Sequence, residues 1–146
     1  TLNHNLTVDW YYVAALERGL HGEPPNPDTE RFFTPSEPFA DCASHASAQH
    51  AVDRRLIDLC IALADDDLAR PIAVPRRTGI TFTAATRLLA HLFQHQIHHR
   101  GQVHAMLSGT PVKTPQLDEF FCADDAPLHA ADFAQLGYTE QAIWGG

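Results

Sequence analysis

The strongest helical pattern in the sequence is that of residues 83–108, TAATRLLAHLFQHQIHHRGQVHAMLS. Its apolar residues recur every three or four positions, which predicts one long amphipathic helix. Gly109 and then Pro111 follow, an order that is typical of a helix C-terminus. One stripe of this helix is apolar in its first half, so it faces the core, and it continues through two histidines: Ala85, Leu88, Leu92, His95, His99, Gln102 and Met106.

Histidine is unusually frequent, with ten in 146 residues and five of them within residues 91–104. His95 and His99 lie one helical turn apart on the core-facing stripe. We therefore expect both imidazoles to point into the interior of a helical bundle and to share one metal ion. A third ligand should come from another helix. His4 is the leading candidate, because it lies on an apolar stripe of the N-terminal segment.

Three neutral imidazoles leave coordination positions open for water or substrate, as in catalytic rather than structural metal sites. Imidazole suits several transition metals, and we expect one divalent ion, zinc or nickel. Four nearby residues are candidates to orient the ligands, relay a proton or hold an anionic substrate: Asp9, His98, Arg100 and Gln102.

The same histidines have a structural interpretation. A lone histidine on an apolar helical face is more often a hydrogen-bonded core residue than a ligand, whereas an i, i+4 pair makes the two interpretations about equal. Arg100 can equally be a cation that faces the C-terminal end of a helix dipole. Solvated or packing roles are expected for the other seven histidines: His21, His45, His50, His91, His98, His104 and His129.

Two further helices are predicted upstream. Residues 2–20 have helical spacing and end at the stop signals Gly19 and Gly22. Residues 22–38 contain five prolines and predict a loop. A second helix, capped by Asp41 or Ser44, runs to about residue 64.

The fold expected from these elements is an all-α single domain over residues 1–146. A short irregular or hairpin connection precedes the last long helix, because prolines and a glycine interrupt the apolar segments IAV and ITF. Three long helices each carry an apolar stripe, so a fourth is needed to cover them. We expect it N-terminal to Thr1 or in a partner chain.

Composition excludes several classes of protein. The net charge is −8, and no Lys/Arg cluster forms a stripe that could follow a phosphate backbone, which disfavours nucleic acid as a partner. No apolar run is long enough for a membrane span. Three cysteines without CxxC spacing argue against a disulfide scaffold and a zinc ribbon, and they lead us to expect a cytoplasmic protein.

The residues LNHNLTVD, followed about ninety residues later by HQIHHRGQVHAML and then QLDEFF, resemble the DinB/YfiT-like metalloenzyme superfamily. The resemblance implies a four-helix bundle, a homodimer and one divalent ion held by His4, His95 and His99. It also implies that the first bundle helix precedes the LNH segment, so we expect residues 1–146 to form an N-terminally incomplete domain. Members with known chemistry are thiol transferases that use a low-molecular-weight thiol such as mycothiol or bacillithiol.

Two functions remain open from the sequence. The first is a metal-dependent enzyme, a thiol S-transferase or a hydrolase, which requires an accessible coordination position. The second is a non-catalytic metal-binding or small-molecule-sensing module, which would have its coordination closed by a fourth protein ligand. No catalytic acid, base or nucleophile is evident, and no Ser-His-Asp order or phosphate loop suggests another chemistry.

Overall fold

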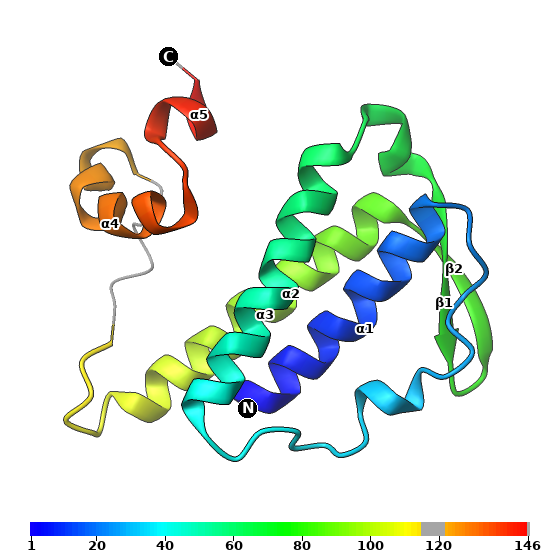
Figure 1. Cartoon of the computed structure of the whole chain (residues 1–146), viewed down its shortest axis with the longest axis horizontal. Coiled ribbons are helices and arrows are strands. Elements are labelled where there is room, and N and C mark those ends of the chain that lie inside the picture. The colour runs from blue at the N-terminus through cyan, green and yellow to red at the C-terminus, as the bar shows by residue number, and fades with distance from the viewer. Residues whose placement is uncertain (115–121, 146) are drawn as a thin grey trace. The chain divides into compact units, whose positions relative to one another are not determined.

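The computed structural model describes residues 1–114 and 122–145 of the chain (Figure 1). It divides into two compact units, Thr1–Met106 and Leu107–Gly146, and each is described by itself. Among the described residues, no helix is both long and apolar enough to cross a membrane.

Three long helices build the first unit: α1 (Leu2–Leu20), α2 (Cys42–Ala62) and α3 (Ala85–Leu107). All three predicted helices are confirmed, with ends within about two residues of the expected ones. Asp41 is the cap of α2, because its carboxylate accepts a hydrogen bond of 2.8 Å from the Ser44 backbone N–H. The proline-rich loop between α1 and α2 contains one short 3₁₀ helix, η1 (Glu30–Phe32).

The direction of each helix follows from its contacts with α1. Asp9 meets Gln49, and Glu17 meets Arg55, so α1 and α2 run parallel and the long loop crosses back between them. Contacts between α1 and α3 fall in the opposite order, so these two helices are antiparallel (Figure 1). The described part of this unit therefore has three long helices, and the four-helix bundle stays a prediction.

The connection before α3 is the predicted hairpin. A second 3₁₀ helix, η2 (Asp65–Ala69), leads into β1 (Pro71–Arg76), which pairs antiparallel with β2 (Gly79–Ala84). The hairpin packs on α1, where the Tyr11 hydroxyl donates to the Pro75 carbonyl. The sequence suggested that α1 ends at Gly19, but the helix continues to Leu20. A Cβ at Gly19 would stand 2.7 Å from Ile72 Cδ1, so the glycine allows α1 to approach β1 closely.

The core lies where α1 meets the other elements. Its fully buried side chains come from α1, α2, the hairpin and the first half of α3: Leu6, Val13, Leu16, Val52, Ile72, Val74 and Leu92. The apolar half of the α3 stripe is thus buried as predicted. The last residue of the stripe, Met106, is not buried, because its side chain is 57% exposed.

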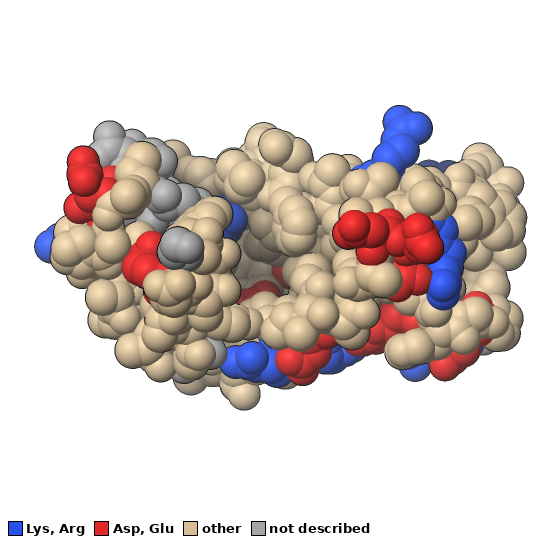
Figure 2. All heavy atoms as spheres, turned by 90° about the horizontal axis from the view of Figure 1, so that it is seen from above, with Lys and Arg blue, Asp and Glu red and all other residues tan. Residues whose placement is uncertain are grey.

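The second unit contains η3 (Ala123–Asp125), α4 (Ala126–Leu136) and α5 (Glu140–Trp144). Its best-buried polar side chain is that of His129, whose Nε2 contacts the Glu140 carboxylate and ties α4 to α5. A packing role for His129 agrees with the sequence interpretation. On the face shown in Figure 2, Lys and Arg side chains do not merge into a basic stripe.

Candidate metal centre

The structure brings His4, His95 and His99 together at one end of the first unit. Each offers a ring nitrogen, and the three nitrogens lie within 4.8 Å of one another. The first turn of α1 supplies His4, and consecutive turns of α3 supply the other two. His95 and His99 are half-buried and His4 is exposed. The cluster therefore lies at the margin of the helices and not in the deep interior that the sequence led us to expect.

The spacing of the nitrogens suits a tetrahedral transition-metal ion. Nε2 of His4 and Nε2 of His95 are 3.3 Å apart. Two nitrogens that each lie about 2.05 Å from a tetrahedral ion are separated by about 3.3 Å. The ring centroid of His99 lies 4.3 Å from that of His95 and 4.7 Å from that of His4, and one of its nitrogens lies within 4.8 Å of the nitrogens of both. The donor set and its geometry thus fit a divalent transition metal.

Burial and neighbouring imidazoles favour the uncharged form of two of the clustered histidines, His95 and His4. Burial lowers the pKa of His95 to about 4, and the neighbouring imidazoles of His99 and His4 add to the effect. Burial also lowers the pKa of His4, again with help from His99. Both rings are therefore neutral at pH 7 with a lone pair available, which is the form that binds a metal.

Gln102 fixes which nitrogen His99 can offer. Its amide oxygen accepts a hydrogen bond of 2.7 Å from His99 Nδ1, so this nitrogen carries the proton and Nε2 keeps the lone pair. Its amide nitrogen donates over 3.0 Å to Nε2 of His98, which holds the amide in that orientation. Two of the four predicted accessory residues, Gln102 and His98, therefore lie beside the cluster.

Asp9 belongs to a different set of contacts. It is only 3% exposed, and its Oδ2 accepts a hydrogen bond of 2.9 Å from Gln49 on α2. Burial raises the pKa of Asp9 to about 6, against the opposing effects of Gln49, Gln96 and Arg100. Its closest contacts are thus with α2 and Gln96, and no contact joins it to a clustered histidine among the described residues. Arg100 is exposed and acts on Asp9 electrostatically.

Sequence reasoning missed a polar layer next to the cluster. Asn5 is 7% exposed, and its amide nitrogen donates to Gln96 Oε1 over 2.5 Å, which joins α1 to α3. Each residue is the chain neighbour of a clustered histidine, His4 and His95. The signal available in the sequence was a polar side chain beside each of these histidines, but only the packed helices show that Asn5 and Gln96 meet.

Comparison with known proteins agrees with the sequence interpretation. The model of the DinB family matches residues 1–132. Neither the curated proteins nor the solved structures contain a significant match. The family expected from the sequence motifs is confirmed, and the match covers α1, α2, the hairpin and α3.

Proposed function

The chain belongs to the DinB family, and from that premise we propose that it is a metal-dependent enzyme with one divalent ion held by His4, His95 and His99. The observation that carries the proposal is the approach of three imidazole nitrogens to within 4.8 Å of one another. Three nitrogen donors without a carboxylate suit zinc or nickel better than magnesium or calcium.

An open coordination position favours catalysis over storage of the ion. Within residues 1–114 and 122–145, the only group of three or more histidine, cysteine or acidic side chains with metal-binding spacing is this trio. His4 is exposed, so solvent and small molecules can reach the site. A non-catalytic binding module would need a fourth protein ligand there.

The reaction we propose is transfer of a low-molecular-weight thiol onto an electrophile. When bound, the ion supplies Lewis acidity, which lowers the pKa of a coordinated water or thiol. The thiol proton would pass to solvent, the thiolate sulfur would form a bond to carbon, and the leaving group would depart with the electron pair of its bond to that carbon. Gln102 holds the proton on His99 Nδ1 throughout, and His98 holds the amide. Arg100 is exposed near the end of α3, where it can hold a carboxylate of the substrate.

The test is thiol consumption by zinc- and nickel-loaded protein with 1-chloro-2,4-dinitrobenzene as electrophile. We expect a rate above that of chelator-treated protein, with loss of the excess rate in His99→Ala. His50→Ala, an exposed histidine of α2, is the control and keeps the rate. A metal-loaded protein that transfers none of a panel of small thiols, and lets no such thiol displace water from the ion, would contradict the enzyme assignment and favour the binding module.

We also propose that the protein is a homodimer. A second face of α3 is apolar and exposed, with Phe93 at 46% and Ile97 at 55% one helical turn apart. A second copy of the same face could cover these side chains by helix packing. Sedimentation at micromolar concentration should give a dimer for the native chain and a monomer for Phe93→Glu. A monomeric native chain would contradict the proposal.

A further inference from the structure

A cavity of about 680 Å³ lies at the other end of α1, between that helix, the loop after it and α2. Thirteen residues separate His4 from Glu17 in the cavity wall, which is about 20 Å along a helix. The cavity is therefore distinct from the histidine cluster. Its volume falls in the range of small-molecule sites, about 300–1,000 Å³.

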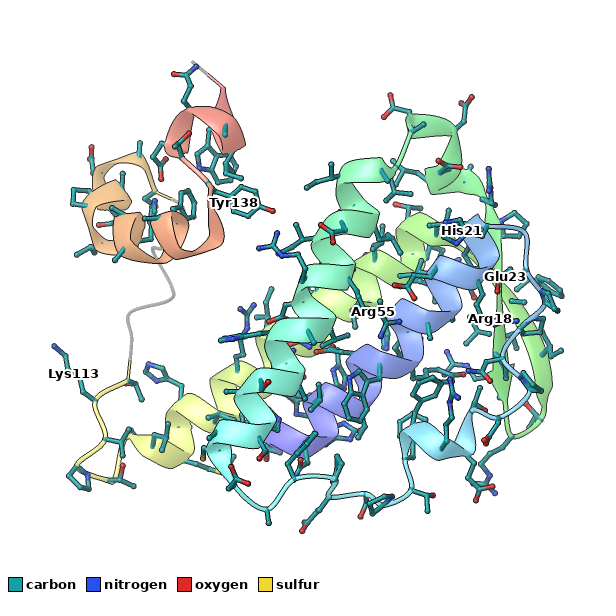
Figure 3. All side chains as sticks on the ribbon, viewed as in Figure 1. Arg18, His21, Glu23, Arg55, Lys113 and Tyr138 are labelled. Atoms are coloured by element: carbon teal, nitrogen blue, oxygen red, sulfur yellow. The ribbon has the colours of Figure 1, made fainter. Side chains whose placement is uncertain are left out.

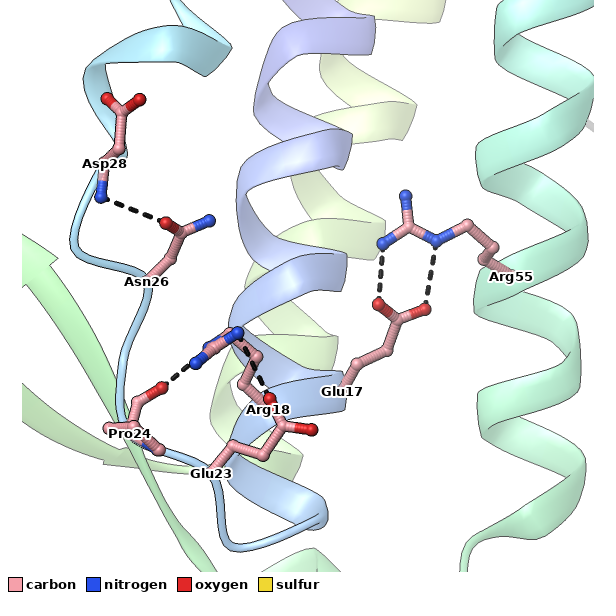
Figure 4. A network of polar contacts seen from close by, with 7 residues as sticks. All are labelled: Glu17, Arg18, Glu23, Pro24, Asn26, Asp28 and Arg55. Atoms are coloured by element: carbon pink, nitrogen blue, oxygen red, sulfur yellow. Dashed lines mark hydrogen bonds and ion pairs between the residues drawn. The ribbon is translucent and has the colours of Figure 1, made fainter.

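The cavity walls are held in place by polar contacts (Figure 4). Glu17 accepts two hydrogen bonds from Arg55, of 3.0 Å from Nε and 2.6 Å from Nη2, and this bidentate pair joins α1 to α2. Arg18 donates to the Pro24 carbonyl over 2.6 Å and pairs with Glu23 at 3.1 Å, which fastens the loop to α1. These bonds make the cavity a preformed one.

The helices give the cavity an apolar surface between these charges. Leu20, Leu59 and Leu63 are partly buried against the core and also line the cavity. Figure 3 shows the polar rim, with Arg18, His21 and Glu23 at the end of α1 and Arg55 on α2. A ligand with an apolar body and polar ends would match this distribution.

Most of the charged groups in the lining neutralise one another. Two carboxylates are taken by Arg55 and Arg18, and Asp67 pairs with Arg70 at 2.7 Å. Two groups stay outside these pairs. The exposed side chain of Asp58 makes no hydrogen bond or ion pair within the described part of the chain. The exposed guanidinium group of Arg31 lies over the Phe32 ring, with its carbon 5.1 Å from the ring centroid, and pairs with no carboxylate among the same residues.

We propose that this cavity binds a small zwitterion with an apolar side chain, an α-amino acid or short peptide. Its ammonium group pairs with Asp58, its carboxylate with Arg31, and its apolar part covers the leucines. A simple anion would leave Asp58 without a counter-charge and approach a protein of net charge −8. A simple cation would leave Arg31 without one. The proposal stands apart from the metal-dependent function.

Isothermal titration calorimetry on the full chain tests this assignment with leucyl-phenylalanine as the probe. Its C-terminal amide lacks the carboxylate, and its N-acetyl form lacks the ammonium group. We expect the zwitterion to bind at least about tenfold more tightly than either analogue. Chelator-treated and zinc-loaded protein should give the same affinity, because the cavity lies away from the metal centre.

Variants assign the two ends. Asp58→Asn should abolish the preference for the dipeptide over its N-acetyl form. Arg31→Gln should abolish the preference for the dipeptide over its C-terminal amide. The charge-matched controls are Asp124→Asn and Arg87→Gln, which change exposed residues outside the cavity and should leave binding unchanged. Absence of dipeptide binding, equal binding of the three probes, or wild-type affinity in both cavity variants would overturn the proposal.

Discussion

The polar groups at the two ends of α1 differ in whether they pair with one another. At the N-terminal end, three imidazoles approach one another, and burial lowers the pKa of His4 and His95. At the C-terminal end, carboxylates and guanidinium groups neutralise one another around a cavity. A neutral imidazole nitrogen with a free lone pair can bind a metal ion, whereas a carboxylate paired with a guanidinium group already has its partner. Clustered polar residues therefore indicate a metal where they keep free donor atoms, and not where they pair with one another.

The largest effect on metal affinity among these substitutions is expected at Gln102. Replacing it with leucine removes the acceptor for the His99 Nδ1 proton, so the metal affinity should fall by about 10–100-fold. Gln102→Glu keeps an acceptor and should stay within about threefold of the native affinity. Competition with a chromophoric chelator measures both.

A second measurement on metal-free protein separates orientation from general damage. Nitrogen NMR of the His99 ring should show the Nδ1–H tautomer in the native chain and in Gln102→Glu, and a mixture of tautomers in Gln102→Leu. Finding the Nε2–H tautomer in the native chain would contradict the assigned role of Gln102.

A smaller effect is expected from the buried carboxyl between the two ends. The pKa of Asp9 is raised from 3.8 to about 6, so its protonated form is favoured by folding. That contribution is complete below pH 4 and is lost as the pH rises to 6. Asp9→Asn should therefore raise the free energy of unfolding above pH 6 by about 2 kcal/mol and leave it little changed near pH 4.

Urea unfolding of chelator-treated protein from pH 4 to 8 measures this difference. Asp53→Asn is the matched control, because Asp53 accepts a hydrogen bond from the same Gln49 amide but is only half-buried. A variant Asp9→Asn that is less stable than the native chain at pH 7 would show that the ionised carboxylate is the favoured form.

The smallest effect is expected at the charged end. The side chains of Glu17 and Arg55 are 29% and 44% exposed, so their ion pair is screened by solvent. Glu17→Gln should lower the free energy of unfolding by about 0.5 kcal/mol and leave metal content unchanged. Glu37→Gln, in the exposed loop, serves as its control. Loss of metal in Glu17→Gln would show that the charged end of α1 affects the metal centre.

Local signals explain which features could be predicted. Periodicity predicted the three helices, and the start of α2 was narrowed to a cap at Asp41 or Ser44, of which Asp41 is the cap in the structure. The histidine trio was found because two members share one helical stripe and the third begins another. The helices and the His95–His99 pair depend on spacing of three or four residues, which the sequence displays directly. His4 lies 91 residues from His95, and its inclusion rested on its apolar stripe and on the family resemblance.

Features that depend on distant pairs could not be predicted. Glu17 and Arg55 are 38 residues apart, and Asn5 and Gln96 are 91 apart. Neither pair has a local signature, since each forms only when the crossing loop sets α1 parallel to α2 and antiparallel to α3. Gly19 was interpreted as a stop for a similar reason, because its contact with Ile72 depends on where the hairpin packs.

The metal content of the purified protein shows whether His4, His95 and His99 hold an ion. Protein made without a histidine tag should carry about one divalent ion per chain by elemental mass spectrometry, and His4→Ala, His95→Ala and His99→Ala should each lose it. His50→Ala should retain it. Native protein that is folded, carries no metal and takes up neither zinc nor nickel would contradict the account.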